Sequence, residues 1–590
     1  MRHLVARKFA AVLSCLALFS STASAVCFVN LSAGGVNSGA SWSDAYTDLQ
    51  TALGNAACAE VWVAKGTYRP TAGSSRTVSF SVRPGVALHG GFAGNEVALN
   101  GRDLAANASV LSGDIGVAAD ASDNSYHVVL IDGTTGAGNV GQDTVVDGFT
   151  ISGGHAADDA SNDSGGGLYC NGTFGHTCNP TLSNLVFTAN TANYGGAMFA
   201  NGYSGECNPS LSDVRFVDNS ASFDGGAIYS WGGASGVSNM ILANAWFENN
   251  SAGGYGGAAI LDGATGGTNL TSVSDATFVD NHATQNGGAI STWSDPPGNV
   301  SPVLTRVTFV TNTAHFGGAI ANMAFHGISN VELNDVTLVA NSSSSGGAIY
   351  SGIERGGTSN STIRGATFSA NAGGLNGGAI YAFVDGSTGS GTAVSGLVLT
   401  NATFTNNTAF YGSVVRTAAS GTAAATESLN SVTFTGNSTT GSGAAIYNDS
   451  SGGAPVNLQL TNAILWGDTS TYPNPEIYQC CGAATATISH SNVMGSHGSG
   501  AQWPASLGTD AGGNIDLDPS LGILQYNGGP TVTMMPAITL ALNLGTNAGC
   551  PATDQRGVSR PQPQASTCDM GAVERQLSED YIFNTRFDLY

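Results

Sequence analysis

The chain has few charged residues, and basic ones are the scarcest. Asp, Glu, Lys and Arg make up only 10% of its 590 residues, against about 25% in an ordinary soluble protein. Only 17 basic residues stand against 40 acidic ones, so the formal net charge is −23. Because binding to phosphate groups needs a basic face, this deficit argues against nucleic acid as a partner.

Long apolar runs are missing beyond the N-terminus. No segment after the first 25 residues reaches the roughly 18 apolar residues of a membrane span, so we expect no span. The N-terminus is typical of an export signal, with Arg2, Arg7 and Lys8 before an apolar run and small residues at 23–25. A lipoprotein site at Cys15 is the alternative, but the apolar stretch before it is short. We therefore expect an exported chain.

Residues that disfavour helices are abundant. The chain contains 83 glycines together with many serines, threonines and asparagines, which suppress helix formation. Its apolar share of 42% is nevertheless sufficient for a continuous core, so disorder is a poor interpretation. The composition predicts an ordered protein that is built mainly from strands and turns.

What the chain does have is a repeat. A Phe-x-x-Asn motif returns about every 30 residues, and a Gly-Gly-Ala-Ile tetrad or a variant of it follows each copy. Leu338 takes the place of one phenylalanine. The phenylalanines are Phe187, Phe216, Phe247, Phe278, Phe309, Phe368, Phe404 and Phe434, and the asparagines are Asn190, Asn219, Asn250, Asn281, Asn312, Asn341, Asn371, Asn407 and Asn437.

This period predicts a solenoid whose units bury their apolar faces by stacking. We expect an all-β fold, a single-stranded right-handed parallel β-helix of the pectate-lyase-like kind. Each coil should turn a phenylalanine and Ile228-like residues inward. Asn281 and its equivalents suit left-handed corners and amide bonds between coils. A short helix that buries Ala45, Leu49 and Leu53 should cap the N-terminal end.

Phe-x-x-Asn followed by Gly-Gly-Ala-Ile resembles the polymorphic outer membrane protein repeat over residues 187–447, with a degenerate copy at 411–414. The C-terminal part is similar to a choice-of-anchor Q domain. The resemblance implies a β-helix outside a Gram-negative cell or on its surface. The residues similar to the anchor domain are 518–522, 527–531, 553–557, 560–561 and 568–574.

Five regions are expected from these patterns. They are a signal peptide (1–25), an N-terminal cap with the first coils (26–145), the β-helix repeats (146–470), the C-terminal coils with the anchor-like domain (471–575) and a tail (576–590).

The mature chain keeps nine cysteines, and most should pair in an oxidising compartment. The predicted disulfides are Cys27–Cys58, Cys178–Cys207 and Cys550–Cys568. Cys178 and Cys207 occupy equivalent positions in successive units, which would lie about 4.8 Å apart. Cys170 competes for the same partners, and the partners of Cys480 and Cys481 stay open.

The candidate binding residues are aromatic. Most directly follow the tetrads, where strand alternation should expose flat rings for a glycan or an extracellular protein. The alternative is that neighbouring rings stack on one another and stabilise the sheet. The residues are Tyr169, Phe199, Tyr229, Trp231, Trp293, Tyr350, Tyr381 and Tyr447.

Catalysis has weaker support. A polysaccharide lyase needs a carboxylate cluster with a basic residue, and a hydrolase needs aspartates on neighbouring coils. Asp218 and Asp280 share a repeat position but are separated by a coil. Asp158, Asp159 and Asp163 are candidate calcium ligands in an exposed loop. We expect a monomer with no cofactor other than calcium, most simply an adhesin, with a carbohydrate-active enzyme and an envelope spacer as alternatives.

Overall fold

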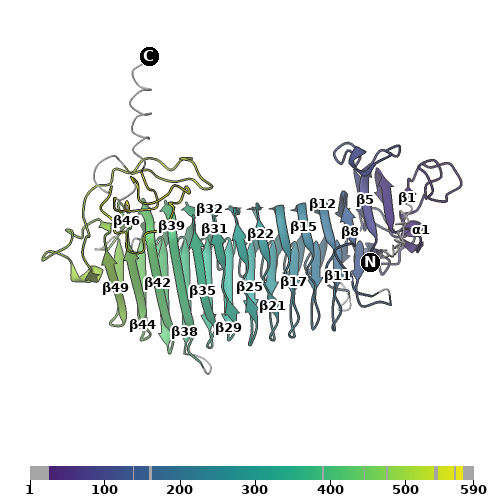
Figure 1. Ribbon diagram of the computed structural model, residues 1–590. Coiled ribbons are helices and arrows are strands. Elements are labelled where there is room, and N and C mark those ends of the chain that lie inside the picture. Colours follow the sequence, from purple (N-terminus) through teal and green to yellow (C-terminus); the bar gives the residue numbers. More distant parts are fainter. Residues whose placement is uncertain are drawn as a thin grey trace, which may run out of the picture.

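The protein is a solenoid of parallel strands (Figure 1). Strands from successive coils stack into one 28-stranded, one 13-stranded and two five-stranded sheets. The predicted right-handed parallel β-helix is confirmed. The computed structural model describes residues 26–136, 138–157, 162–387, 391–443, 445–472, 476–536, 542–563 and 566–575. The signal segment (1–25) and the tail (576–590) lie outside the described residues.

The 28-stranded sheet runs the length of the solenoid. Its strands are β1 (Val26–Val29), β2 (Glu60–Ala64), β3 (Gly66–Tyr68), β5 (Ala87–Phe92), β6 (Ser109–Ser112), β8 (Val145–Asp147), β9 (Phe149–Ser152), β12 (Thr181–Thr188), β15 (Ser210–Val217), β18 (Ile241–Glu248), β21 (Thr268–Asn269), β22 (Ser272–Ser274), β23 (Thr277–Val279), β26 (Asn299–Val300), β27 (Val303–Thr305), β28 (Thr308–Val310), β30 (Ile328–Ser329), β31 (Glu332–Asn334), β32 (Thr337–Val339), β35 (Thr358–Arg364), β36 (Thr367–Ser369), β39 (Val394–Thr405), β42 (Ala424–Thr435), β45 (Val456–Thr461), β46 (Ile464–Leu465), β49 (Ala484–Ser489), β50 (Asn492–Val493) and β51 (Thr509–Asp510).

The other sheets complete each coil. The 13-stranded sheet contains β4 (Phe80–Ser81), β7 (Val129–Asp132), β11 (Leu168–Asn171), β14 (Met198–Asn201), β17 (Ile228–Trp231), β20 (Ala259–Asp262), β25 (Ile290–Ser294), β29 (Ile320–Phe325), β34 (Ile349–Glu354), β38 (Ile380–Gly386), β41 (Val415–Gly421), β44 (Ile446–Gly452) and β48 (Ile477–Cys480). The five-stranded sheets contain β10 (His155–Ala156), β13 (Thr191–Tyr194), β16 (Ser220–Asp224), β19 (Ser251–Ala252) and β24 (His282–Ala283), and then β33 (Ser342–Ser345), β37 (Ala372–Asn376), β40 (Thr408–Tyr411), β43 (Ser438–Thr439) and β47 (Thr469–Ser470).

The repeat phenylalanines form a file inside the solenoid, as predicted. Phe216 pairs in register with Phe247, and Phe247 pairs with Phe278. The ring centroids are 4.7 and 4.5 Å apart, close to the ladder spacing of about 4.8 Å. Leu338 continues the file between Phe309 and Phe368. The spacing of the sheet therefore lets identical apolar side chains pack against one another along the core.

The repeat asparagines form a buried ladder beside this file. The side-chain amide of Asn250 donates to Asn281 Oδ1 at 2.9 Å and to the carbonyl oxygen of Phe216 at 2.9 Å. The prediction of amide bonds between coils is confirmed, but the prediction of left-handed backbone at Asn281 is wrong. The left-handed residue is the one before it, Asp280, with φ of 52°. This turn at Asp280 directs the next side chain into the interior, where the ladder needs it.

A short helix, α1 (Leu49–Gly54), lies at the N-terminal end (Figure 1). Asp48 caps it by accepting hydrogen bonds from the N–H groups of Gln50 and Thr51. Leu49 and Leu53 are buried, as predicted, whereas buried Ala45 precedes the helix. Three 3₁₀ turns are described, η1 (Leu99–Gly101), η2 (Ala121–Asp123) and η3 (Ala505–Leu507). None of the helices in the described ranges is long and apolar enough to span a membrane.

Two predicted disulfides are present, Cys27–Cys58 and Cys550–Cys568. The predicted Cys178–Cys207 pair is wrong, because Cys178 is bonded to Cys170 and Cys207 is a buried thiol. Equivalent positions on stacked coils keep their Cβ atoms near the ladder spacing of about 4.8 Å, which is wider than the 3.5–4.5 Å that a disulfide prefers. Cys170 comes from a different strand of the coil and approaches Cys178 from the side.

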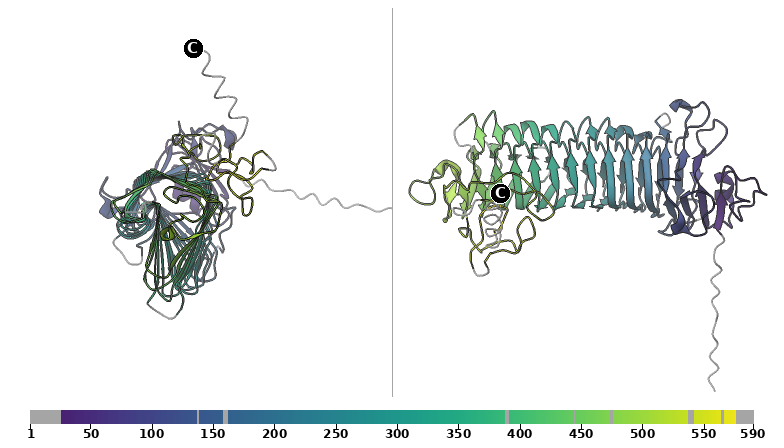
Figure 2. Two further views of the ribbon diagram at one scale, coloured as in Figure 1. Left: turned by 90° about the vertical axis from the view of Figure 1, so that its left-hand side faces the viewer. Right: turned by 90° about the horizontal axis from the view of Figure 1, so that it is seen from above.

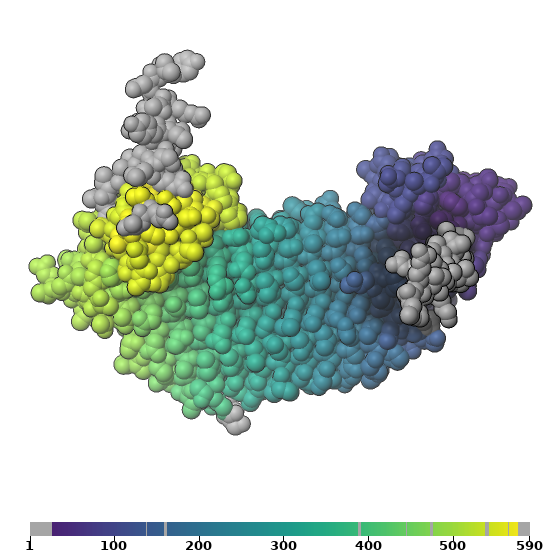
Figure 3. Space-filling model, in the orientation of Figure 1, coloured from purple at the N-terminus to yellow at the C-terminus, as the bar shows by residue number. Residues whose placement is uncertain are grey.

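After β51 the chain leaves the coils and folds back along the outside of the solenoid. Residues 516–575, here called the C-terminal segment, lie over the last coils, where Figures 1 and 3 show them in yellow against green. Gln555 is buried against the 28-stranded sheet and accepts a hydrogen bond from Thr403 Oγ1 at 2.7 Å. Arg556 forms a buried salt bridge with Asp554 at 3.0 Å within this segment.

Candidate binding site

The 13-stranded sheet carries the aromatic residues that follow the tetrads. In β17 the alternation is regular, with Ile228 and Ser230 buried and Tyr229 and Trp231 only partly buried. Ile228 belongs to the central core, as predicted, whereas Tyr229 and Trp231 do not. The first glycine of each tetrad has a positive φ, for example 69° at Gly225, and so makes the bend that starts this strand.

The rings on the outer face stack along the solenoid. Tyr169 lies on Phe199 with centroids 5.6 Å apart and planes at 5°, and Phe199 lies 5.1 Å from Tyr229. The prediction of flat exposed rings is therefore wrong for much of the stripe, because stacked rings hide their faces from solvent. Four of these residues are buried, namely Phe199, Tyr350, Tyr381 and Tyr447.

A second aromatic column, which the sequence analysis missed, covers the first. Its members stand directly before the tetrads and contact the ring after the tetrad on the next coil. Tyr194 meets Tyr229 edge-on at 5.6 Å, and Phe316 stacks on Tyr350 at 4.8 Å. The sequence does contain a signal for this column, because an aromatic residue directly precedes several of the tetrads. The residues are Tyr194, Tyr255, Phe316 and Tyr411.

The two columns enclose a hollow near the N-terminal end of the stripe. Its volume is about 410 Å³, and carboxylates stand beside the rings. We call it the aromatic–acidic hollow, and its lining residues are Asp163, Ser164, Tyr194, Phe199, Asp224, Tyr229 and Trp231. A second hollow of about 340 Å³ shares Asp163 and Ser164 and extends it past Tyr169, His127 and Asp132. Together they form a continuous polar and aromatic surface.

Two carboxyl groups at this surface have raised pKa values. Burial raises the pKa of Asp262 to about 6, although the Tyr229 hydroxyl donates to it at 2.6 Å. Burial also raises the pKa of Asp224, which accepts a hydrogen bond from the backbone N–H of Tyr255 at 2.8 Å. Because carboxyl oxygens accept hydrogen bonds, the hollow offers hydrogen-bond acceptors beside aromatic walls. It suits a ligand that is rich in hydroxyl groups and carries no negative charge.

The predicted residues divide into two groups. The structure brings Tyr169, Phe199, Tyr229 and Trp231 to the two hollows, together with Asp163. The other four belong to packed clusters further along the solenoid. Trp293 lies against Phe325 and Tyr255, Tyr350 against Tyr381, and Arg416 lies between Tyr381, Tyr411 and Tyr447 and forms a 2.6 Å salt bridge with Asp449.

The calcium hypothesis rests on residues that are mostly outside the described part of the chain. Asp158 and Asp159 are among these, and Asp163 accepts a hydrogen bond from Ser164 Oγ at 2.8 Å. Within the described ranges, two groups could converge on a metal ion, and Asp163 is in neither. One is Cys170, Cys178 and Cys207, and the other is Asp449, Cys480 and Cys481. The first group is already occupied by a disulfide.

The aspartates considered for hydrolysis lie at exposed corners. Asp218 accepts a hydrogen bond from Asn249 Nδ2 at 2.5 Å, and Asp280 accepts one from Thr311 Oγ1. Both have left-handed backbone, with φ of 56° and 52°. Neither lines the aromatic–acidic hollow. Both aspartates therefore have the geometry of turn residues, and the structure gives no support for a role in hydrolysis.

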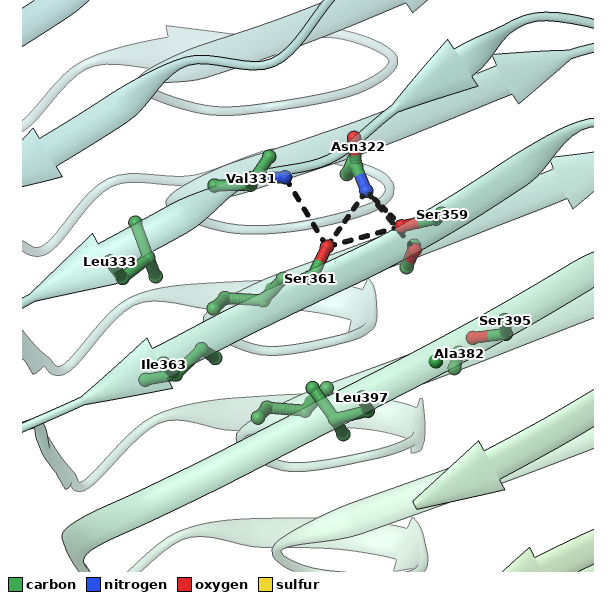
Figure 4. Close-up of a pocket in the computed structure, with 13 residues that line it drawn as sticks. Asn322, Val331, Leu333, Ser359, Ser361, Ile363, Ala382, Ser395 and Leu397 are labelled. Carbon is green, nitrogen blue, oxygen red and sulfur yellow. Dashed lines mark hydrogen bonds between the residues drawn. The ribbon is translucent and has the colours of Figure 1, made fainter. Parts of the chain in front are cut away.

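An internal cavity of about 20 Å³ lies between the sheets (Figure 4). Asn322 Nδ2 donates to Ser359 Oγ at 2.9 Å, and Ser361 Oγ lies 3.1 Å from Ser359 Oγ. Apolar side chains such as Leu397 close the remaining walls. This volume is sufficient for about one water molecule, which would hydrogen-bond to the buried polar groups. The cavity is too small for a substrate.

Comparison with known families agrees with the coil architecture. A profile described as the Chlamydia polymorphic membrane protein (Chlamydia_PMP) repeat matches residues 213–230, 275–292 and 431–449. The chain carries polymorphic membrane protein repeats. The first matched repeat spans Asp224 and Tyr229, so it contributes part of the hollow. A search among curated proteins finds no match to the chain.

Proposed function

We propose that the protein is displayed at the cell surface and binds oligosaccharides in the aromatic–acidic hollow. The observation that carries this proposal is the placement of the carboxyl groups of Asp224 and Asp163 beside Trp231 and Tyr194 in one hollow of about 410 Å³. Carbohydrate recognition uses this combination, in which rings contact the C–H faces of a sugar and carboxylates accept hydrogen bonds from its hydroxyls.

The charge of the hollow narrows the ligand class. Four carboxyl groups lie in or beside the two hollows, those of Asp132, Asp163, Asp224 and Asp262. Among the described residues that line the hollows, the one side chain that can carry a positive charge is His127. Burial lowers the pKa of His127, so this imidazole is neutral at neutral pH. Uronic acids and sialic acids would be repelled. Neutral and amino sugars fit the site.

Surface display is supported by the repeats and by the shape. The matching profile is named for membrane proteins, and the chain begins with a sequence typical of export. A solenoid holds its outer faces rigid over its whole length (Figure 2). Such a body is suited to presenting a binding surface away from the cell.

The test is a glycan array with the purified chain and two variants of the hollow. We expect binding to neutral or amino oligosaccharides, with a loss of at least about tenfold in affinity for Trp231→Ala and for Asp224→Asn. Trp246→Ala is the matched control, because Trp246 is partly exposed on a different sheet. Melting temperatures of all variants exclude unfolding as the cause.

Two outcomes contradict the proposal. If the control variant loses binding as much as the two hollow variants, the glycan contacts another surface. If the chain binds only polyuronates and cleaves them, the enzyme alternative replaces the adhesin. A turnover assay on polyuronates with the same sample distinguishes these results.

A further inference from the structure

The 28-stranded sheet bears a groove along the corner that precedes each repeat phenylalanine. Three residues before each phenylalanine position from Phe216 onward, and before Leu465 at the equivalent position, the backbone is left-handed, with φ between 52° and 68°, and the sheet bends. We call this feature the corner groove. Its corner residues are Asp213, Asn244, Asp275, Arg306, Asp335, Gly365, Asn401, Ser431 and Asn462.

The C-terminal half of the corner groove is already occupied. Asn401 Nδ2 donates to the carbonyl oxygen of Thr553 at 2.7 Å, and Asn462 bonds to both the N–H and the carbonyl of Thr546. Thr433 Oγ1 accepts the backbone N–H of Ala572 at 2.9 Å. These are contacts between groove side chains and the main chain of the C-terminal segment. The groove therefore already binds polypeptide of this chain through main-chain hydrogen bonds.

The N-terminal half of the same groove is uncovered. Asp213, Asn244 and Asp275 are exposed, whereas Asn401 and Asn462 at equivalent positions are buried. A hollow of about 520 Å³ runs over these coils between β15 and β23, lined by Arg215, Trp246 and Thr277 among others. Figure 1 places β15 and β22 between the N-terminal cap and the C-terminal segment, and the surface dips there in Figure 3.

The uncovered half carries an excess of negative charge. Each arginine there is matched by one carboxylate, in the salt bridges Arg215–Glu248 (3.6 Å), Arg306–Asp275 (2.6 Å) and Arg364–Glu332 (3.4 Å). Four aspartates are left over, Asp213 and Asp335 at the corners of the groove and Asp218 and Asp280 at the neighbouring corner, two residues after a phenylalanine. In the described part of the chain, no salt bridge involves Asp213, Asp218, Asp280 or Asp335.

We propose that the uncovered half of the corner groove binds an extended, basic segment of another protein. The groove continues an interface that polypeptide already fills, and its spare carboxylates complement basic side chains. Trp246 is 37% exposed and stands at the centre of the hollow with Arg215 beside it. Tryptophan and arginine are the residues that most often anchor such interfaces. This inference is independent of the glycan site, which lies on another sheet.

The experiment is selection of random dodecapeptides, displayed on phage, against the full chain. The enriched peptides should carry a surplus of lysine and arginine. Synthetic copies should bind in fluorescence anisotropy, and their affinity should fall at least about tenfold between low salt and 0.5 M salt because exposed charges are screened. Trp246→Ala should weaken binding at least about tenfold, and Thr277→Arg should do the same by filling the hollow and repelling basic peptides.

The matched control is Trp231→Ala, which removes a tryptophan from the other sheet and should leave peptide affinity unchanged. If Trp246→Ala lowers the melting temperature, Thr277→Arg decides the question alone, because Thr277 is a partly exposed residue of the hollow and not part of the core. Enriched peptides without basic character, or equal binding to wild type and Thr277→Arg, would overturn the proposal. Competition by neutral oligosaccharides at the peptide site would also overturn it, since the groove would then be a glycan site.

Discussion

The side-chain amide of Asn437 donates a hydrogen bond of 2.8 Å to the carboxylate of Asp468, so the asparagine ladder ends on a buried acid. Burial raises the pKa of Asp468 to about 6. Glu476 lies beside it, and burial together with the charge of Asp468 holds the pKa of Glu476 well above its usual range. The pair therefore holds a proton to higher pH than free carboxyl groups do.

Stability is expected to be highest at mildly acidic pH. Burial raises the pKa values of Asp262 to about 6, Glu427 to about 7 and Asp468 to about 6. Unfolded carboxyls release their protons near pH 4, so the stability that these groups contribute is complete below pH 4 and is lost as pH rises through 6–7. Ionising one such carboxyl group in the folded protein costs about 3 kcal/mol of stability when its pKa is raised by about 2.

Asp147 has the opposite effect on the pH dependence of stability. Burial alone would raise its pKa, but hydrogen bonds from His89, Asn184 and Ser183 and the charge of Arg102 hold that pKa below its usual range. Its contribution is therefore lost as pH falls below about 4. Denaturant unfolding at pH 3, 4.5, 6 and 8 should give a maximum near pH 4.5. A free energy of unfolding that rises steadily from pH 4.5 to 8 contradicts this assignment.

Asp468→Asn should stabilise the protein at high pH. An asparagine keeps the oxygen that accepts from Asn437 and continues the amide ladder, and it removes a buried charge. We expect a gain of about 2–3 kcal/mol at pH 8 and little change at pH 4.5, where the native carboxyl is already neutral. Asp218→Asn is the matched control at an exposed corner and should change the free energy of unfolding by less than about 0.5 kcal/mol. Equal effects of Asp468→Asn at both pH values would show that charge is not the cause.

Adjacent asparagines allow a direct test of the ladder. Asn250 is buried and its side chain bonds to Phe216, Asn219 and Asn281, whereas Asn249 is exposed with φ of 54°. Asn250→Ala leaves several buried polar groups without partners, so we expect a loss of about 3–5 kcal/mol. Asn249→Gly suits the left-handed backbone and should be neutral within about 1 kcal/mol. Urea unfolding measures both, and a comparable loss in the two variants would argue against the ladder.

The interior of the solenoid could be predicted because it is periodic. Phe216, Phe247 and Phe278 recur at the spacing of the coils, and so do their asparagines, so the stacked register follows directly. The left-handed residue was misplaced by one position, from Asp280 to Asn281. The repeat motif shows which residue type a corner needs, but it does not show which of two neighbouring polar residues turns inward.

The outer surface could be predicted only in part. Strand alternation correctly predicted that Tyr229 points away from the core. It could not predict that the ring of Tyr194 covers Tyr229, because Tyr194 belongs to a different strand of the preceding coil. The C-terminal segment was harder still. Gln555 meets Thr403 across 152 residues of sequence, and no periodic signal connects them. Contacts of that kind depend on how the whole solenoid is assembled.

Cys207 should remain a free thiol beside the Cys170–Cys178 disulfide. Burial holds the pKa of Cys207 far above its usual range, so the thiolate that attacks a disulfide or an alkylating reagent is almost absent at pH 8. Mass spectrometry of the alkylated native chain should find Cys170 linked to Cys178 and Cys207 unlabelled. After denaturation Cys207 should label fully. Exposed Cys481 is the control that reagent reaches without unfolding, although a hydrogen bond with Cys480 raises its pKa to about 11 and slows its labelling. A Cys178–Cys207 linkage in the native protein would show that the lateral approach of Cys170 does not decide the pairing.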